Sequence, residues 1–368
     1  MLQGLRVAPS APPPIVPRTV STDMPASPAT LVTPSCPDLH RWLFGGALAH
    51  PSGAIAGWRE AETGRLSDEY PEISGYFLSA AVFADATSSP VVAGAAEWLT
   101  ERIEANEIAS RRADGPAIYN FDQGIIAAGL LKYGIRTGHA RTMTAGVRAA
   151  ASLRDQIQRH GHLPTLDPTG GQPQGRPATW STVGRLHLAK TVQCLLLAAE
   201  LGEGGMRDAA RMLIADTRAR FSLGSESFRE ANGETNLHST CYALEGFWIW
   251  NAANAEDDRD ELLEATMDEL IAKRLPSGGF PRNASLPGEQ SDVTSQVARL
   301  ALLLAREEAA RPTIARLRAV AIPTERGYAM PYQPEASELH QNAWVTMFAA
   351  QSLALADGVR GLEWWELI

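Results

Sequence analysis

Six stretches of this chain are nearly free of charged residues and rich in Ala, Gly and Leu, and they recur at almost regular intervals. Their first residues lie 49, 61, 55, 55 and 48 positions apart. A helix that is apolar on all sides has to be buried on all sides, so each stretch predicts a buried helix. A period of this length is typical of a repeat architecture. The six stretches are Glu72–Ala84, Phe121–Tyr133, Thr182–Leu201, Leu237–Trp250, Asp292–Ala305 and His340–Ala356.

Between these stretches lie amphipathic segments whose apolar residues recur three and four positions apart, as in a helix with one exposed face. They are Val91–Ile108, Ala140–Arg159, Met206–Arg220, Asp260–Arg274 and Pro312–Val320, with Asp38–Ala49 as a further candidate. This alternation predicts an all-α fold, an (α/α)6 barrel or α/α toroid with a short extended connector before each inner helix. An open superhelical stack is the alternative, but stacks usually end in polar capping repeats. The last stretch, His340–Ala356, is as apolar as the others, which favours closure.

The first 37 residues differ in composition from the rest of the chain. They contain nine of its 24 prolines, including the run Pro12-Pro13-Pro14. Such a segment is typical of a flexible or polyproline-like leader. We therefore expect a proline-rich flexible leader at residues 1–37 and a single toroid domain at residues 38–368.

Charge, hydropathy and cysteine content exclude several classes of protein. With 33 Lys and Arg against 42 Asp and Glu, the net charge is −9, and no basic cluster interrupts this acidity, so we expect no nucleic-acid partner. No window of about eighteen residues is uninterruptedly apolar, so we expect no transmembrane segment. The three cysteines, Cys36, Cys194 and Cys241, are too sparse for a disulfide framework. The N-terminus lacks the apolar core of a signal peptide. These features favour a cytoplasmic protein.

The polar residues of the charge-poor stretches gather at their N-terminal turns. Examples are Tyr70-Pro71-Glu72-Ile73-Ser74-Gly75-Tyr76 and Asn236-Leu237-His238-Ser239-Thr240-Cys241-Tyr242. In a closed barrel these turns meet at one mouth, where the helix N-termini also direct unpaired N–H groups and positive dipole ends. We expect a cup at this mouth that suits an anionic or hydroxyl-rich ligand.

The residues of this expected cup divide into two groups of candidates. The catalytic candidates are Glu72, Asp122, His238 and His340, assisted by Tyr76 and Tyr242. The substrate-binding candidates are Tyr70, Tyr119, Trp180, Arg185, Arg282, Asp292, Gln296 and Trp344. Structural alternatives stay open, because Asp is a good N-cap, His is often a hydrogen-bonded core residue, and Tyr often separates helices.

Nothing in the chain predicts a cofactor or a metal. It lacks phosphate-binding glycine loops, a nucleophile elbow and the zinc-protease motif. His238 and Cys241 share a helical face, and His340 could join them, but this set lacks the further ligand that a zinc site requires.

Several motifs together look like those of a known group of proteins. They are Tyr-Pro-Glu-Ile-Ser-Gly-Tyr (70–76), Phe-Asp-Gln-Gly (121–124), His-Ser-Thr-Cys-Tyr-Ala-Leu-Glu-Gly (238–246), Ser-Gly-Gly-Phe (277–280) and Asp-Val-Thr-Ser-Gln-Val-Ala (292–298). The chain resembles, over about residues 45–356, bacterial α/α-toroid proteins associated with exopolysaccharide biosynthesis. Their toroid is similar to the C-terminal domain of glucuronyl C5-epimerases and, more distantly, to terpene-cyclase-like and prenyltransferase-like barrels. The resemblance implies a toroid fold and activity on an acidic glycan.

The leading hypothesis is a carbohydrate-active enzyme of polysaccharide biosynthesis or modification, with epimerase-like or lyase-like acid–base chemistry on a uronic acid. Such chemistry needs a base, an acid on the opposite face and donors that hold the enediolate. Hydrolysis by Glu72 and Asp122 stays open. One alternative is a prenyl or terpenoid-type toroid enzyme. Another is a non-catalytic glycan-binding or assembly protein that docks a partner through Trp364-Trp365, although packing of this tail on the barrel explains its apolarity better than docking does.

Overall fold

The computed structural model describes residues 34–107, 117–171, 173, 178–221, 229, 233, 235–254, 260–283, 288–336, 339–359 and 361–368. Residues 34–368 form one compact unit. The expected leader, apart from residues 34–37, lies outside the described residues, as does Ile108 at the end of one predicted helix. No helix in the described part is long and apolar enough to cross a membrane.

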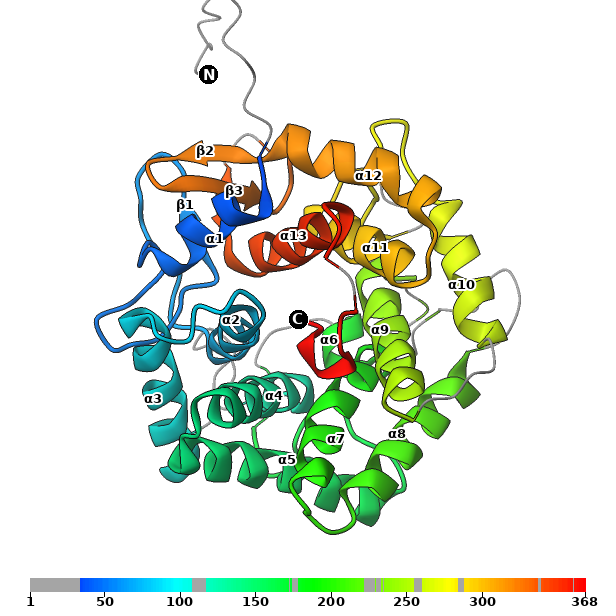
Figure 1. Cartoon of the computed structure of the whole chain (residues 1–368). Helices are drawn as coiled ribbons and strands as arrows, with labels where there is room; N and C mark the ends of the chain where they lie inside the picture. The colour runs from blue at the N-terminus through cyan, green and yellow to red at the C-terminus, as the bar shows by residue number, and fades with distance from the viewer. Residues whose placement is uncertain are drawn as a thin grey trace, which may run out of the picture. The chain divides into compact units, whose positions relative to one another are not determined.

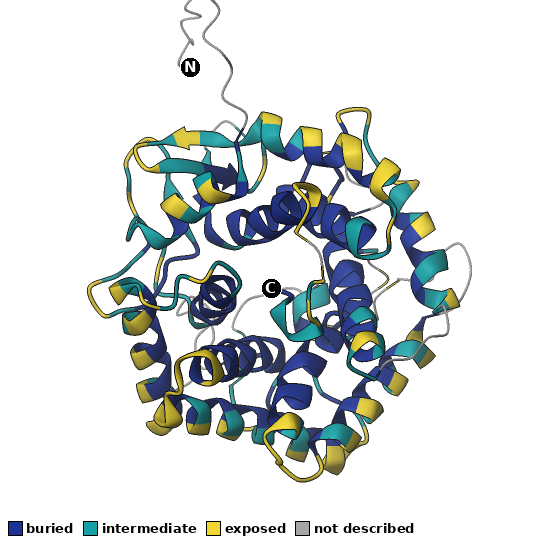
Figure 2. Cartoon of the chain, viewed as in Figure 1, coloured by how far each residue is buried: buried dark blue, intermediate teal, exposed yellow. Residues whose placement is uncertain are grey.

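The inner ring of this unit is built from the charge-poor stretches, and Figure 2 shows that its helices are buried on nearly every side. Within the described residues its members are α2 (Pro71–Phe83), α4 (Asn120–Thr137), α7 (Val192–Glu200), α9 (Leu237–Asn254), α11 (Ser291–Leu303) and α13 (Ala343–Ala356). The last helix, α13, packs against both α11 and α2. The ring therefore closes, and the open stack is excluded.

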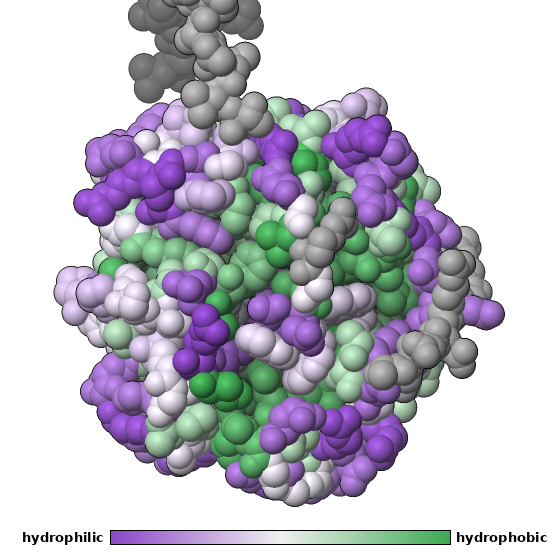
Figure 3. Space-filling model, viewed as in Figure 1, coloured by the Kyte–Doolittle hydropathy of each residue, from purple (hydrophilic) through white to green (hydrophobic). Residues whose placement is uncertain are grey.

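The amphipathic segments form the outer ring (Figure 1). They are α1 (Cys36–Phe44), α3 (Pro90–Glu104), α5 (Ala140–His160), α8 (Met206–Arg220), α10 (Glu261–Ile271) and α12 (Glu307–Val320). Helix α5 illustrates the pattern, because Ala145, Ala149, Leu153 and Ile157 recur every four residues on its buried face. On the face of the molecule seen in Figure 3, hydrophilic residues gather around the rim, and hydrophobic patches lie between them. The predicted (α/α)6 barrel is confirmed.

The third inner stretch is not the continuous helix predicted for Thr182–Leu201. A short helix α6 (Trp180–Val183) comes first, and the chain is then extended at Gly184, with φ −74° and ψ 161°. The 3-10 helix η2 (Leu186–Thr191) follows and leads into α7. The hydroxyl of Thr165 donates to the Gly184 carbonyl at 2.5 Å, so a neighbouring segment holds the break. The break separates the first helical turn from α7.

A small sheet replaces the predicted start of the sixth inner helix at His340. Residues His340–Asn342 form strand β4, and α13 begins only at Ala343, with the Asn342 side chain accepting from Val345 N at 3.0 Å. Within the described residues the antiparallel strand order is β1 (Trp58–Glu60), β4, β3 (Gly327–Pro331), β2 (Ile322–Thr324). Pairing of Trp58 with Asn342 and of Glu60 with His340 brings chain segments far apart in sequence to one edge of the barrel mouth.

Helices α2 and α4 approach so closely that glycine is required where they cross. A Cβ on Gly129 would collide with the carbonyl oxygen of Gly75, and a Cβ on Gly75 would lie 2.8 Å from the Cα of Ile126. Neither neighbour is a flexible side chain, so the helices would have to separate.

We expect Gly129→Ala to lower the free energy of unfolding by about 1–3 kcal/mol, the usual cost of overpacking. Urea unfolding measures the change. Gly204→Ala is the matched control, because a Cβ there meets nothing within 4 Å. Equal unfolding midpoints for the two variants would contradict the close packing of α2 on α4.

The tail after α13 packs inside the ring rather than on its outer surface (Figure 1). Leu367 and Ile368 are fully buried. Lys132 Nζ donates to the Leu367 carbonyl at 2.8 Å, and Lys190 Nζ donates to the Ile368 carbonyl at 2.9 Å. The tail therefore supplies acceptors to two lysines that the inner helices bury.

Candidate functional site

A cavity of about 450 Å³ lies at the barrel mouth, where the N-terminal turns of the inner helices meet. This volume falls in the usual range for a small-molecule site. Its walls are Trp58, Tyr70, Glu72, Ile73, Tyr119, Phe121, Asp122, Thr179, Trp180, Ser181, His187, His238, Tyr242, Arg282, Asp292, Tyr332, His340, Asn342 and Trp344.

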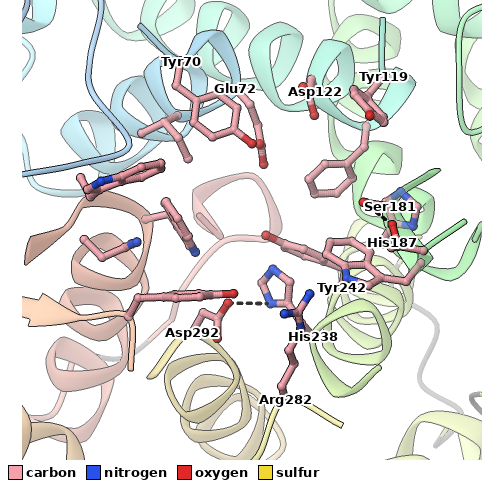
Figure 4. A pocket seen from close by; sticks show the side chains of 18 of the residues that line it. Tyr70, Glu72, Tyr119, Asp122, Ser181, His187, His238, Tyr242, Arg282 and Asp292 are labelled. Carbon is pink, nitrogen blue, oxygen red and sulfur yellow. Dashed lines mark hydrogen bonds and ion pairs between the residues drawn. The ribbon is translucent and has the colours of Figure 1, made fainter. Parts of the chain in front are cut away.

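Three carboxylates among the described residues line the cavity, each from the first turn of an inner helix. Glu72 belongs to α2, Asp122 to α4 and Asp292 to α11. The positive end of the helix dipole stabilises an acid at this position, which explains why the fold tolerates three buried acids. The Asp292 Oδ1 atom also accepts from Val293 N at 2.8 Å. Glu72 and Asp122 come from neighbouring helices, whereas Asp292 lies across the cavity with His238 (Figure 4).

His238, in the first turn of α9, is buried and held through one ring nitrogen. Its Nδ1 atom lies 2.6 Å from Gln296 Oε1 and 3.7 Å from Asp292 Oδ2. The other ring nitrogen points into the cavity, on the side of Tyr242 (Figure 4). An imidazole oriented by a polar partner behind it is common where histidine acts as a general acid or base, so the geometry is compatible with that role.

Two tyrosines, Tyr242 and Tyr76, lie deeper in the barrel than His238, and only one of them reaches the cavity. Tyr242 lines the cavity, and its ring centroid is 4.4 Å from that of His238. Tyr76 does not reach the cavity and instead packs edge-on against Phe348. Burial raises the pKa of both phenols well above the usual value, so at neutral pH they are hydrogen-bond donors rather than bases.

Aromatic side chains form much of the remaining wall. Trp58 and His340 stack with centroids 5.5 Å apart and rings within 9° of parallel. Tyr332 packs edge-on against Trp344, and Trp180 packs edge-on against both His187 and His238. Tyr70 and Tyr119 complete this wall. Such apolar faces between polar groups are typical of sites that bind a small polar ligand.

Three of the residues that the sequence suggested lie outside the cavity. Arg185 stands half-buried next to Asp216 on α8, with 3.9 Å between the charged atoms, because the break at Gly184 turns the chain there. Gln296 is fully buried behind His238, and Tyr76 lies one helical turn below the mouth. The other candidates line the cavity, and their roles stay predictions.

Several wall residues were not among the candidates: Trp58, Ile73, Phe121, Thr179, Ser181, His187, Tyr332 and Asn342. Trp58 and Asn342 reach the cavity through strand pairing, and Tyr332 follows strand β3 directly. Ser181 and His187 reach it because α6 and η2 replace the expected straight helix. Ile73 and Phe121 stand beside Glu72 and Asp122 and could have been found from that adjacency.

His187 is fully buried, and its Nδ1 atom has no hydrogen-bond partner among the described residues. Burial, assisted by the charge of His238, lowers the pKa of His187 from 6.5 to about 3. Between these two pH values His187 is protonated in the unfolded chain and neutral in the folded protein. The free energy of unfolding therefore falls as the pH falls from 6.5 towards 3.

We expect His187→Phe to weaken this acid destabilisation by up to about 1.4 kcal/mol per pH unit over that window. The aromatic replacement keeps the packing against Phe121 and Trp180. Urea unfolding at several pH values measures the slope. His160→Gln, at the exposed end of α5, is the control and should leave the slope as it is. Identical slopes for His187→Phe and the wild-type protein would contradict a neutral buried His187.

The zinc set considered from the sequence does not assemble. Cys241 is fully buried and burial raises the pKa of its thiol, while His340 stacks on Trp58. Throughout the described residues, no three His, Cys, Asp or Glu side chains lie together as a metal site needs.

No protein-family model matches the sequence, and no curated protein sequence matches it. Solved structures do share the fold. The unsaturated glucuronyl hydrolase of Bacillus sp. GL1, responsible for glycosaminoglycan degradation, is 15% identical with a TM-score of 0.65 over 86% of this chain and 95% of the other. A heparin-specific unsaturated glucuronyl hydrolase is 11% identical, with a TM-score of 0.67 over 87% and 96%. An α-amylase from Clostridium perfringens is 13% identical, with a TM-score of 0.60 over 87% and 98%. At these identities the likeness establishes the toroid fold.

Proposed function

We propose that this chain is a carbohydrate-active enzyme that performs acid–base chemistry on an acidic glycan at the barrel mouth. One observation carries the proposal: two carboxylates from α2 and α4 and an oriented imidazole from α9 line a single cavity from different sides. The aromatic wall suits the apolar faces of sugar rings. The names of the structures that share its fold, which are glycan hydrolases, agree with this class.

The reaction that best uses these groups begins at the ring carbon of a uronic acid next to its carboxylate. His238 accepts the proton from this carbon, and the electron pair of the broken C–H bond passes into the carboxylate as an enediolate. Arg282, exposed at the mouth, and the phenol of Tyr242 line the same cavity, and we assign them the role of holding that negative charge. Glu72 or Asp122 in its protonated form then returns a proton on the opposite face, which is epimerisation. Alternatively it protonates the oxygen that leaves from the neighbouring carbon, which is elimination.

Glycoside hydrolysis is the second candidate, and the presence of both Glu72 and Asp122 in the cavity wall favours it. They stand in the first turns of neighbouring helices and line the same cavity, as the acid and the second carboxylate of a glycosidase must. In that reaction one carboxylic acid protonates the glycosidic oxygen, and the other carboxylate activates water or attacks the sugar carbon. A role in exopolysaccharide biosynthesis is compatible with either reaction.

A thermal-shift screen of the purified chain tests the substrate class. The ligands are uronic-acid oligosaccharides, neutral oligosaccharides of equal length, prenyl diphosphates and zinc. A ligand that binds the native state raises the melting temperature with concentration, and we expect this for the acidic sugars. Arg282→Gln should diminish the shift, whereas Arg159→Gln on the outer helix α5 should not. The proposal would be overturned if only prenyl diphosphate or zinc raised the melting temperature, or if none of the ligands raised it.

The reaction type is then read from the products of the ligand that binds. Deuterium incorporation from D2O at the carbon next to the carboxylate supports epimerisation, and a new double bond absorbing in the ultraviolet supports elimination. A released sugar without deuterium at that carbon supports hydrolysis. A bound glycan that is never converted would instead indicate a non-catalytic glycan-binding protein.

A further inference from the structure

Gln296 connects the cavity to a charged cluster buried within the barrel. Its side chain is fully buried in α11 and has a partner at each end of the amide. The Oε1 atom lies 2.6 Å from His238 Nδ1, and the Nε2 atom donates to Glu245 Oε1 at 3.3 Å. Since Gln296 does not line the cavity, its role there is indirect.

The direction of this amide is decided by Glu245. Glu245 is fully buried in α9, in an ion pair with Arg299 and in another with Lys190 at 3.0 Å. Burial alone would raise the pKa of Glu245, but the two cations lower it below its usual value, so the carboxylate is ionised. An ionised carboxylate only accepts hydrogen bonds. The NH2 end of Gln296 therefore faces Glu245, and the carbonyl end faces His238.

The carbonyl end in turn decides which nitrogen of His238 carries the proton. A carbonyl oxygen only accepts, so Nδ1 of the neutral imidazole has to be the protonated nitrogen. The Asp292 Oδ2 atom, 3.7 Å from the same nitrogen, favours the same arrangement. Nε2, on the cavity side of the ring, is then left with a lone pair (Figure 4).

We propose that Gln296 is the positioning residue that holds His238 as the Nδ1–H tautomer, anchored by Glu245, so that Nε2 faces the substrate as a base. The inference rests on the proposed function for its catalytic meaning, but the tautomer is a property of the free protein. The cluster behind it extends from Lys190 to the tail, because Lys190 also donates to the Ile368 carbonyl.

Histidine-directed 15N NMR on the full chain without any ligand tests this inference. The His238 signals are assigned by their loss in His238→Gln. In the wild-type protein we expect a protonated Nδ1 and an unprotonated, high-frequency Nε2 resonance. Gln296→Met, which keeps the length of the side chain but has no amide, should shift His238 towards the Nε2–H tautomer. An Nε2–H tautomer in the wild-type protein would overturn the proposal. An unchanged spectrum in Gln296→Met would also overturn it and would leave Asp292 as the orienting group.

A second variant keeps the test decisive where Gln296→Met does not fold. Gln296→Glu retains an acceptor for Nδ1, and its second carboxyl oxygen takes the place of the amide nitrogen that faces Glu245. Two buried carboxyl groups in contact share a proton, so we expect the new side chain to be protonated on the Glu245 side. The other titratable or charged groups around His238 are Asp292, His187, Tyr242 and Arg282. We expect Gln296→Glu to keep the Nδ1–H tautomer of His238. An Nε2–H tautomer in this variant would contradict the contact.

Failure of this inference and failure of the proposed function give different results. If the tautomer is as expected but no glycan is bound or converted, the proposed function fails and Gln296 still orients His238. If a glycan is converted while Gln296→Met leaves both the spectrum and the pH profile of kcat/KM unchanged, the function holds and the positioning role fails. In the consistent case, Gln296→Met lowers kcat more than it alters KM.

Discussion

Replacing Asp122 by Asn is expected to lower kcat/KM on the converted glycan by about two to four orders of magnitude, the usual contribution of a general acid or base. Asn has nearly the shape of Asp, so the packing of the first turn of α4 is retained while the ability to give or take a proton is lost. Steady-state kinetics measures the loss. Far-ultraviolet circular dichroism and urea unfolding should show a folded protein whose free energy of unfolding is within about 1 kcal/mol of the wild-type value.

The matched control for this variant is Asp260→Asn. Asp260 is the N-cap of the outer helix α10, accepts from Leu263 N at 3.3 Å and pairs with Arg218, all outside the cavity. Its replacement should lower stability and leave kcat/KM unchanged. If Asp122→Asn behaves in the same way, with lower stability and full activity, Asp122 only stabilises the first turn of α4 and the acid–base role is excluded.

Replacing Glu245 by Gln is expected to lower the free energy of unfolding by about 3–5 kcal/mol, the usual cost of breaking a buried ion pair on one side. Glu245, Lys190 and Arg299 are all buried to within 1% of full burial, so water cannot solvate the two cations that the variant leaves without their anion. Urea denaturation measures the loss through the unfolding midpoint.

An exposed ion pair provides the control for this prediction. Glu97 on α3 pairs with Arg141 on α5, and both side chains are nearly half exposed. Glu97→Gln should cost no more than about 1 kcal/mol, because water and salt screen such pairs. Equal effects for the two variants would mean that Lys190 is neutral in the folded protein and that Glu245 does not anchor the cluster.

The fold was predictable because burial acts on whole helices. A helix such as Leu237–Trp250, with hardly a charge on any side, has no place in a soluble protein except between two other layers. Its alternation with amphipathic helices therefore predicted both rings. Departures occurred where backbone geometry is set by distant partners. Thr165 holds the break at Gly184, and strand pairing with Glu60 draws His340 into a strand.

The cavity was predictable only in part, for a related reason. Glu72, Asp122 and His238 stand in first turns of inner helices, and the direction of those helices alone brings them to the mouth. Arg185 occupies a comparable position in the sequence, yet the broken third stretch turns it towards Asp216. His187 could not be recognised as a cavity residue from the sequence. A single histidine in a charge-poor segment has the same sequence pattern whether its side chain lies in the core or in the cavity wall.

Sequence alone determined which surfaces of this chain are buried, because the hydrophobic effect depends on composition and periodicity and hardly on the identity of the partner. The closed toroid and the gathering of acids at one mouth follow from that. Only the tertiary structure decided which polar groups meet, because a hydrogen bond depends on distance and direction. The contact of Gln296 with both His238 and Glu245 joins residues 58 and 51 positions apart, and a small change in helix packing would have separated them.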